Sequence, residues 1–455
     1  MHVEQPPEVM AIFSKIGQER LEDVLRAMKS PDKRASRDYL HWDKLRHLDP
    51  PGDLTSEEWW LAVKLARNAV ARQLPLLDPQ GRPFSYSTPD EALRALHVID
   101  QECAGAIAMP EVVVADGGAR NHYLVNSLME EAIRSSQLEG ATTARRVAKE
   151  LLESGRAPKD RSEQMVLNNY RAINFMRDNV DGDLLPRHVL ELHRIVTEGT
   201  LDDPDAAGRL QTTAEERVVV LDSTTGELIH SPPPAEQLPG RLAELCDFAN
   251  GGAMEGAFLH PVVRAILVHF WLAYDHPFED GNGRTARALF YWSMRRQGYW
   301  VVEYLSISHI LRRAPAQYAR SFLFTETDDR DTTYFILAQL AVIERAIAQF
   351  RDYVTRKVAE VRAVEGLLGV GDDLNHRQVS LLGDAVKQDG RSHTFAAHAR
   401  RYGVTHQTAR NDLLDLMTRG LLERRKAGRT HLFYPVPDLA ERLGARRGPM
   451  APGQG

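Results

Sequence analysis

The sequence predicts a mainly α-helical protein, and three observations support this fold class. Apolar residues recur at steps of three and four over 261–275 and again over 285–297, which is the period of a helix with one buried face. The same spacing joins Leu124 to Ile133 and stops at Gly140, a residue type that commonly ends helices. Strand signals are strong in only two short stretches, near 217–230 and 421–434. We therefore expect a helical core that carries two hairpins.

Composition and charge are those of an ordinary globular protein. The 455 residues are 43% hydrophobic and 26% charged, and the net charge of −6 gives no overall case for nucleic-acid binding. Cys103 and Cys246 form no metal or redox spacing, so we expect buried thiols in a reducing compartment. No apolar run approaches the ~18 residues of a membrane span, and the first thirteen residues lack the pattern of a signal peptide. These observations predict a cytoplasmic protein without a membrane partner.

One run of twelve residues, from His276 to Arg287, concentrates the chemistry of the chain. It lies between the two helices predicted at 261–275 and 285–297, and the second helix is expected to begin within 281–284. A helix N-terminus binds phosphate readily because its first N–H groups have no partner and its dipole end is positive. The two glycines of the run let the backbone approach a ligand closely. The run therefore predicts a loop that holds a polyphosphate.

The charged residues of the run favour a reaction on that polyphosphate. Arg284 and Arg287 are three residues apart, so they share a helix face and can both bind phosphate oxygens. Asp280 can hold a hard cation such as Mg²⁺, and His276 has a pKa suited to taking a proton near neutral pH. Taken alone, a His-Pro pair before a helix or a Gly-Asn-Gly stretch is more typical of a simple turn. Only the complete string favours a catalytic site.

This run resembles the signature of the Fic (Fido-domain) family, His-x-Phe-x-Asp/Glu-Gly-Asn-Gly-Arg-x-x-Arg, at every position. The resemblance implies a mostly α-helical fold and transfer of AMP from ATP to a protein hydroxyl, with Mg²⁺ or Mn²⁺ as cofactor. It implies that His276 deprotonates the target Ser, Thr or Tyr, that Phe278 anchors the loop and that Asp280 holds the metal. The nucleotide-binding residues that it implies in and after the run are Gly281, Asn282, Gly283, Arg284, Thr285, Arg287 and, from a looser match, Tyr318.

A second stretch, Ser135 to Gly140, ends the helix that the sequence predicts at 121–140. By itself it is typical of a surface helix that stops at glycine. Beside the catalytic run it resembles the inhibitory motif of the same family, Ser/Thr-x-x-x-Glu-Gly/Asn. The resemblance implies that Glu139 pairs with Arg287, and an arginine held by a carboxylate cannot also hold a γ-phosphate. In some members this glutamate also helps to remove AMP, and the sequence leaves that activity open here.

A third element is a β-hairpin predicted from the branched residues at 217–221 and 228–230, with the turn at 222–227. Pro232 to Pro234 follow and cannot continue a paired strand. The hairpin resembles the flap of the family, which lays a target segment beside the catalytic histidine by strand pairing. An ordinary edge hairpin is the alternative. The resemblance adds three flap residues to the nucleotide site, Leu228, Ile229 and His230.

The chain is expected to divide into an N-terminal helical region (1–110), a Fic domain (111–355), a smaller domain (375–440) and a disordered tail (448–455), with a hinge at 369–373. The N-terminal region contains an aromatic cluster of Trp42, Trp59 and Trp60. Its residues match no chemistry that we can name.

The smaller domain differs from the rest in charge. Residues 375–447 contain fourteen Lys and Arg against seven Asp and Glu, so this segment carries +7 while the remainder carries −13. Helices predicted at 379–387, 395–402 and 405–419 precede a hairpin, which resembles a winged helix-turn-helix. Such domains bind duplex DNA or dock proteins, and both alternatives stay open. The DNA contacts that the resemblance predicts are Thr405, Gln407, Thr408, Arg410 and Asn411 on the third helix and Arg424, Arg425, Lys426 and Arg429 on the wing.

Three functions from different classes are compatible with these patterns. The first is an AMP transferase acting on the hydroxyl of a target protein, which can be the chain itself. The second is a DNA-binding transcriptional regulator that carries a Fic core, and the third is a nucleotide-sensing interaction protein that Glu139 keeps silent. The sequence leaves the target, the preferred nucleotide and a homodimer open.

Overall fold

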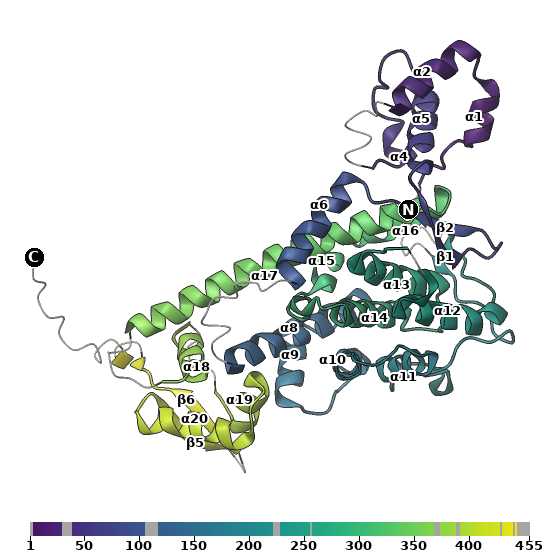
Figure 1. Ribbon diagram of the computed structural model, residues 1–455. Helices are drawn as coiled ribbons and strands as arrows, with labels where there is room; N and C mark the ends of the chain where they lie inside the picture. The colour runs from purple at the N-terminus through teal and green to yellow at the C-terminus, as the bar shows by residue number, and fades with distance from the viewer. Residues whose placement is uncertain are drawn as a thin grey trace, which may run out of the picture.

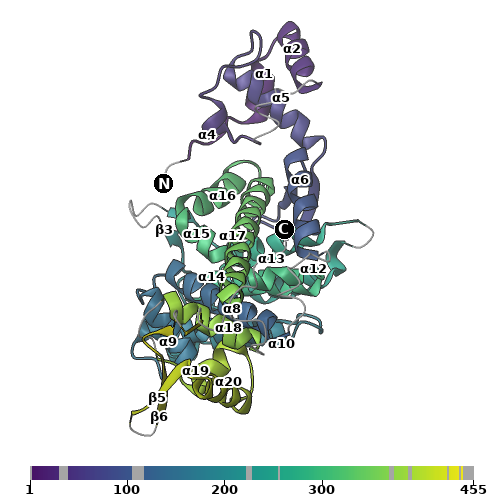
Figure 2. The same cartoon turned by 90° about the vertical axis from the view of Figure 1, so that its left-hand side faces the viewer.

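The structure, a computed structural model, describes residues 3–29, 39–104, 117–221, 228–254, 257–367, 374–387, 392–427, 430–439 and 442–443. The predicted flap turn at 222–227, the predicted hinge at 369–373 and the tail at 448–455 therefore lie outside the described residues. The elements form three parts along one long axis (Figures 1 and 2). A small helical unit lies at one end, the helical core in the middle and the smaller domain at the other end.

The described residues of the end unit form four short helices, which are α1 (Val9–Lys15), α2 (Gln18–Lys29), α4 (Trp42–Leu45) and α5 (Ser56–Asn68). The start of α5 is fixed by a capping box. Thr55 Oγ1 accepts the N–H of Glu58 at 3.2 Å, and the Glu58 carboxylate accepts the N–H of Thr55 at 2.7 Å. Trp59 and Trp60 of α5 are buried in the apolar cluster of this unit, with Trp42 packed against it. The predicted aromatic cluster is thus the small core of this unit.

The structure contains a hairpin that was not predicted from the sequence, between β1 (Arg72–Leu77) and β2 (Pro83–Tyr86). Its inward residues and those of the following helix, α6 (Asp90–Ile99), belong to the same apolar core as the helices on either side of the 276–287 run. A π-helical turn, η1 (Asp100–Ala104), follows. The main core therefore begins near residue 74 and crosses the boundary that was predicted at 110.

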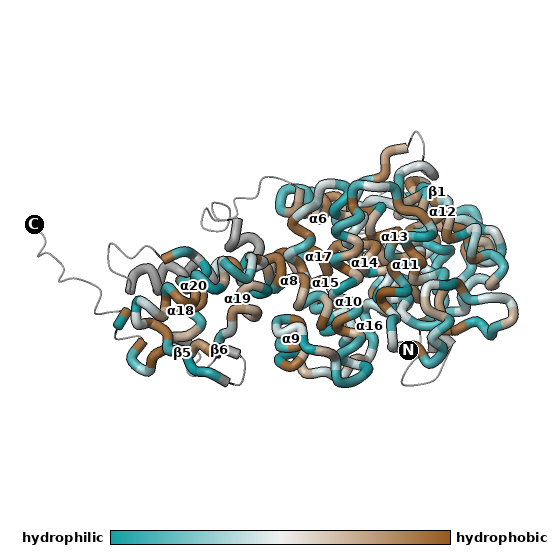
Figure 3. The backbone as a smooth tube through the Cα atoms, turned by 90° about the horizontal axis from the view of Figure 1, so that it is seen from below, coloured by the Kyte–Doolittle hydropathy of each residue, from teal (hydrophilic) through white to brown (hydrophobic). Residues whose placement is uncertain are grey.

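The central part is a bundle of helices, joined by short 3₁₀ turns and one small hairpin of β3 (Val220–Leu221) and β4 (Leu228–His230). Figure 3 shows apolar segments gathered inside the bundle and polar segments on its outer loops. In chain order the helices are α8 (Gly117–Leu138), α9 (Arg145–Ser154), α10 (Arg161–Asp178), α11 (Pro186–Thr197), α12 (Leu238–Asn250), α13 (Pro261–Asp275), α14 (Asn282–Arg296), α15 (Ile307–Arg313), α16 (Pro315–Thr327) and α17 (Thr333–Leu367), with 3₁₀ turns at η2 (Pro204–Ala206), η3 (Ala235–Gln237), η4 (Gly252–Met254) and η5 (Trp300–Tyr304).

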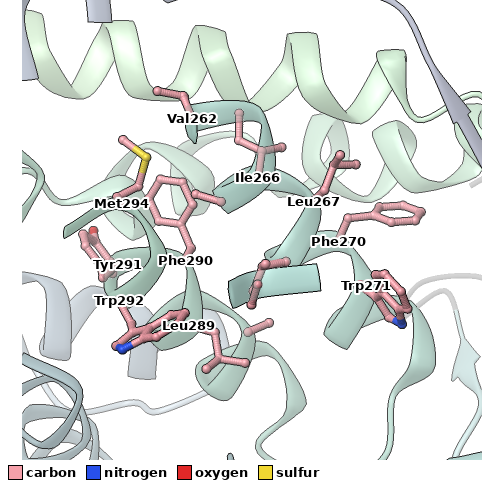
Figure 4. Close-up of a cluster of buried hydrophobic side chains, with 14 of the residues drawn as sticks. Val262, Ile266, Leu267, Phe270, Trp271, Leu289, Phe290, Tyr291, Trp292 and Met294 are labelled. Carbon is pink, nitrogen blue, oxygen red and sulfur yellow. The ribbon is translucent and has the colours of Figure 1, made fainter. Parts of the chain in front are cut away.

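Helices α13 and α14 form the centre of this bundle, at the bounds predicted from the sequence to within three residues. Pro261 occupies the first turn of α13, where its missing N–H costs nothing. Both helices are buried almost all round, as expected for a helix that neighbours cover on every side. Figure 4 shows their side chains in one cluster, with Val262, Ile266 and Phe270 from α13 and Phe290 and Met294 from α14. This packing rigidly supports the loop that joins them.

The smaller domain consists of α18 (His376–Lys387), α19 (Phe395–Tyr402) and α20 (His406–Thr418), followed by the antiparallel strands β5 (Leu422–Ala427) and β6 (Thr430–Pro435). Every one of these elements was predicted, and Gly403 ends α19 in the left-handed conformation. A further bridge pairs His393 with Phe433. The domain packs on the core through α19, which contacts α8 and α9, and Arg400 donates a hydrogen bond to Glu153 C=O at 3.1 Å.

The two cysteines are unpaired and buried, as predicted. Burial raises the pKa of both thiols to about 12, so neither is a reactive thiolate at neutral pH. Among the described residues no helix has the length and apolar character needed to cross a membrane.

Candidate functional site

The loop between α13 and α14 is held in shape by its own residues. Phe278 is fully buried, and its backbone N–H and C=O both bind the side chain of Asn282, at 3.0 and 2.8 Å. The sequence resemblance placed Asn282 in the phosphate cradle. The structure instead uses its side chain as a clamp on the loop, and its backbone N–H remains at the start of α14. The anchoring role predicted for Phe278 agrees with its burial.

His276 ends α13 in the left-handed region, with φ of 45°. Its Nδ1 faces Ala273 C=O at 3.3 Å, which places the ring proton on Nδ1 and leaves the Nε2 lone pair as the acceptor. Burial lowers the pKa of His276 to about 4, and the neighbouring His230 and Arg217 also lower it, while Glu139 acts in the opposite direction. The pKa thus lies below the near-neutral range expected from the sequence. The imidazole is neutral at pH 7 and ready to accept a proton.

The N-terminus of α14 provides the anion-binding groups. The first hydrogen bond of the helix runs from Thr285 N–H to Gly281 C=O at 2.9 Å, so the three N–H groups before Thr285 have no carbonyl of the helix to bind. Gly281 has φ of 81°, and a Cβ there would lie 2.8 Å from Thr197 Cγ2. Thr285 itself is fully buried and its N–H is used within the helix. It therefore supports the turn and presents no exposed group to a nucleotide.

Gly283 marks the point where Glu139 of the preceding segment reaches α14. A Cβ at Gly283 would lie 2.3 Å from Glu139 Oε1 and 3.0 Å from Arg287 Nη1. No side chain can be accommodated there while these two groups keep their places. Glycine at this position therefore lets the carboxylate of Glu139 and the arginine of α14 meet beside the anion-binding N–H groups.

The predicted inhibitory residues meet as the sequence resemblance implied. Glu139 Oε1 lies 2.9 Å from Arg287 Nη1, and the Arg287 side chain is only 2% exposed. Arg287 also donates to Ser135, through Nε to Oγ at 2.9 Å and through Nη2 to the backbone C=O at 3.1 Å. Gly140 follows in the left-handed conformation with φ of 93°, which explains a glycine at this place. The end of α8 thus holds the guanidinium of Arg287 on two sides.

Asp280 lies at the mouth of the loop, with its carboxylate 42% exposed. One oxygen accepts the N–H of Gly281 at 2.5 Å, and the other lies 3.2 Å from Arg284 Nη2 and 4.0 Å from Arg161 Nη2. Arg284 is fully buried and also donates to Val196 C=O at 3.1 Å. Its contact with phosphate, expected from the sequence, therefore requires the pair with Asp280 to open.

The mouth of the loop offers one exposed carboxylate, that of Asp280, as a ligand for Mg²⁺. Among the described residues no cluster of three metal-ligating side chains occurs. This donor set still fits Mg²⁺ on a nucleotide, because that ion keeps several waters and is held by one or two carboxylates together with phosphate oxygens. Asp280 is the residue that would hold it.

His193 of α11 packs against the loop and supports it. This role of His193 was not predicted from the sequence. Its ring stacks on Phe278 with centroids 3.8 Å apart. Nε2 donates to Asp280 C=O at 2.9 Å, while Nδ1 accepts the N–H of Gly208 at 3.0 Å. Burial lowers the pKa of His193 to about 4, so the ring stays neutral with this tautomer fixed. No local pattern around His193 signals this role, because its partners are distant in the sequence.

The hairpin lies against the end of α13 and not in an open cleft. His230 is buried, with Nε2 donating to Tyr274 C=O at 2.6 Å and Nδ1 facing Glu326 at 2.9 Å. The side chain therefore anchors the hairpin, and the nucleotide contact expected of His230 stays a prediction. Leu228 and Ile229 form strand β4, and their side chains lie outside the described residues.

Arg217, just before the hairpin, completes this anchor and was not identified as a site residue from the sequence. Its Nη2 donates to Asp275 C=O at 2.8 Å and to His276 C=O at 3.2 Å, and its Nε donates to Pro233 C=O at 2.9 Å. The last carbonyls of α13 are therefore satisfied by the hairpin and its flanks. Helix ends need such partners because their final C=O groups have none within the helix.

The comparisons with known proteins point the same way as this geometry. Residues 183–294 match the family described as the Fic/DOC family. The chain is 30% identical over 169 residues to protein adenylyltransferase fic-1 of Caenorhabditis briggsae, across 36% of this chain and 31% of that protein. It is 37% identical over 111 residues to protein adenylyltransferase Fic of Nematostella vectensis, across 24% of this chain and 23% of that protein. The chain thus spans less than a third of the length of either relative.

Solved structures of Fic proteins are also similar. A Fic family protein from Desulfovibrio desulfuricans G20 covers 76% of this chain and 94% of its own, with 19% identity and a TM-score of 0.45. A fragment of Fic-1 from C. elegans covers 59% of this chain and 72% of its own, with 24% identity and a TM-score of 0.42.

Three groups of predicted residues lie outside the matched segment, which are residues 135–140, described above, Tyr318 and the residues of the smaller domain. Tyr318 of α16 donates or accepts a hydrogen bond with His269 Nε2 at 2.9 Å, close to Arg287. In the smaller domain Thr405, Gln407, Arg410 and Asn411 are exposed and Thr408 half-buried, and Arg424, Arg425 and Lys426 are exposed on β5. Arg429 lies outside the described residues.

Proposed function

We propose that this chain is a protein adenylyltransferase that moves AMP from ATP to a Ser, Thr or Tyr hydroxyl of a protein. The observation that carries the proposal is the placement of a neutral imidazole with a free Nε2 beside the three unpaired N–H groups at the start of α14. The names of the relatives in the Fic segment support the same activity. A target protein is implied as substrate, and ATP and Mg²⁺ would bind with it.

The chemistry follows from these positions. His276 Nε2 takes the proton of the target hydroxyl, and the hydroxyl oxygen forms a bond to the α-phosphorus of ATP. The bond from that phosphorus to the bridging oxygen breaks, and pyrophosphate leaves with the electron pair. The N–H groups at the start of α14 stabilise the charge on the α-phosphate oxygens. Mg²⁺, held by Asp280, would supply neutralisation of the phosphate charge.

Glu139 explains how the same site would be silenced. A γ-phosphate needs Arg287, and that guanidinium is already held by Glu139 and Ser135. We infer an autoinhibited resting state, in which only the removal or displacement of Glu139 allows ATP to bind in the orientation for transfer. Removal of AMP from a modified target, with the help of Glu139, is a second activity that this site leaves open.

The experiment that tests the function is transfer of label from ATP labelled at the α-phosphate, with Glu139→Gly as the active background. We expect protein labelling in this variant and a decrease of about 10²–10⁴-fold when His276→Ala is added. The matched control is His47→Ala, because His47 is an exposed histidine far from the loop. Binding of ATP should persist without His276. Labelling within a few-fold of the background after His276→Ala would contradict the proposal.

A second proposal concerns the smaller domain, which we propose to bind duplex DNA through α20 and β5. Arg410 of α20 and Arg424, Arg425 and Lys426 of β5 are exposed, and Arg425 lies 3.6 Å from Glu423. Of the acidic residues of α20, Asp412 is buried and binds Arg377 and His398, and Asp415 is paired with Gln378 and Arg419. Docking of the target protein by the same face is the competing outcome.

A further inference from the structure

A cavity of about 650 Å³ lies between the Fic core and the smaller domain. Its walls come from α8, α9, α15, α17, α18 and α19. The volume is in the range of sites for small molecules, which is roughly 300–1,000 Å³. None of the residues that line it belongs to the run from 276 to 287. The cavity is therefore separate from the catalytic loop.

The lining of this cavity has an excess of positive charge. Five cationic side chains face three carboxylates, and two of these carboxylates are already neutralised: Glu130 by Arg145 at 2.8 Å and Asp384 by Arg401. Arg313, at the end of α15, has no ion-pair partner among the described residues, and the same holds for Arg356 of α17. Lys149 lies 3.6 Å from Glu153, so Arg313, Arg356 and the carboxylate of Asp352 are left after these pairs form, and their net positive charge favours an anionic ligand. The lining cations are Arg145, Lys149, Arg313, Arg356 and Arg401, and the carboxylates are Glu130, Asp352 and Asp384.

Aromatic rings form another part of the wall. Tyr304, Phe350 and Tyr353 line the cavity, and the rings of Tyr304 and Phe350 lie 5.7 Å apart. Ser306 and Gln349 add side chains that can form hydrogen bonds beside them. Flat aromatic surfaces bind the face of a planar base, while arginines bind phosphate oxygens in a fork. The two features together fit one chemical class, a base that carries phosphate.

We propose that this interdomain cavity is a nucleotide-binding site distinct from the catalytic loop. Its phosphate end would lie at Arg313 and Arg356 and its base against Tyr304, Phe350 and Tyr353. One wall is α8, through residues 126, 127, 129, 130 and 133, and the last turn of this helix holds Arg287. A ligand in the cavity therefore touches the same helix that carries the inhibitory contact, along with the domain that packs on it.

The test is binding of ADP to the full-length chain by titration calorimetry. The parent should show two sites, one in the Fic loop and one in the cavity. Arg313→Ala combined with Arg356→Ala should weaken one site about tenfold or more and leave the other unchanged. Arg187→Ala, an exposed arginine of α11, is the matched control and should keep both. Retention of both affinities in the double variant, or a single site that Arg287→Ala alone removes, overturns the proposal.

Hydrogen exchange provides a second readout that needs no variant. ADP should slow exchange in 300–313 and 346–356 of the parent as well as in 276–287. Protection confined to 276–287 would place all ADP in the Fic loop and contradict the cavity site. Neither measurement depends on AMP transfer. Failure of the proposed enzymatic activity and failure of the cavity site are therefore distinguishable.

Discussion

Glu139 Oε1 and Arg287 Nη1 lie 2.9 Å apart, across the position where a Cβ of residue 283 would be. The carboxylate is 28% exposed, whereas the arginine is buried. The arginine is thus fixed in the protein, while the carboxylate reaches it from the solvent side. A phosphate oxygen that approaches the start of α14 must replace this carboxylate to bind the same guanidinium.

Removing the charge of Glu139 should activate transfer. We expect Glu139→Gln to raise AMP transfer about tenfold or more, since a contact worth about 1.4 kcal/mol corresponds to a factor of ten. Glu139→Gly should raise it further because the side chain also leaves the site. The matched control is Glu150→Gln, at an exposed glutamate of α9. Self-labelling with labelled ATP is the measurement. Unchanged labelling in a folded Glu139→Gly protein would refute the inhibitory role.

Asp280 should be required for the metal dependence of the reaction. In the Glu139→Gly background we expect Asp280→Asn to lower transfer about 100-fold or more at saturating Mg²⁺, because phosphate charge is then poorly neutralised. The measurement is initial rate against Mg²⁺ concentration. Asp202→Asn, an exposed carboxylate near Arg161, serves as control. An Asp280→Asn enzyme with the parent's rate and Mg²⁺ response would show that another group holds the metal.

The stability of the fold should decrease as the pH falls below about 6.5, because buried histidines resist protonation in the folded chain. Burial lowers the pKa of His193 and His276 to about 4 and that of His269 to about 3. The unfolded chain binds protons at these histidines below about 6.5, whereas the folded chain does not. Stability is therefore complete above that pH and decreases as the pH falls toward 4, by up to about 1.4 kcal/mol per pH unit for each histidine.

Thermal unfolding between pH 7 and pH 4.5 checks this expectation, with His47→Ala as a neutral control and His193→Asn as the informative variant. The pH slope should be smaller in His193→Asn. The acid limb of kcat/KM should likewise lie near 4 and not near 6.5, because His276 stays unprotonated to that point. An acid limb centred at 6.5 would mean that the imidazole is fully solvated in the working enzyme.

Binding of duplex DNA by the smaller domain should depend on its exposed arginines. We expect the full-length chain to shift duplex DNA at low salt, with affinity that falls steeply as salt rises. Arg410→Ala with Arg425→Ala should weaken binding and reduce the salt slope by about one for each phosphate that the variant no longer binds. Arg187→Ala is again the control. If micromolar protein leaves DNA unshifted at low salt, the face is a protein-docking surface.

The central helices and the catalytic loop were predictable because their signals are local. The spacing of apolar residues predicted α13 and α14 nearly to the residue, and the loop motif is continuous in the chain. The elements of the smaller domain were predictable for the same reason, since Gly403 marks the end of α19 and the sequence between 421 and 434 has a turn signal at Gly428.

The features that were not predicted depend mostly on distant partners. Arg217 and His193 bind backbone carbonyls that are 58 and 87 residues away in the sequence. Nothing in the residues around them distinguishes them from other arginines and histidines of the chain. The depressed pKa of His276 likewise arises from tertiary burial. The hairpin of β1 and β2 is different. Its turn at Asp78 to Gly81 is a readable local signal, so this hairpin could have been predicted.

The attachment of the hairpin to α13 has a consequence for how a target is accepted. His276 lies at the end of a helix whose final carbonyls accept hydrogen bonds from Arg217 and His230. These two residues come from a segment dozens of residues earlier in the chain. A target strand that pairs with β4 would therefore shift the same hydrogen bonds that fix the orientation of the His276 ring. We infer that binding of the acceptor segment and orientation of the His276 imidazole occur together. A poorly fitting acceptor would then be rejected by misalignment of the base, without any separate discriminating pocket.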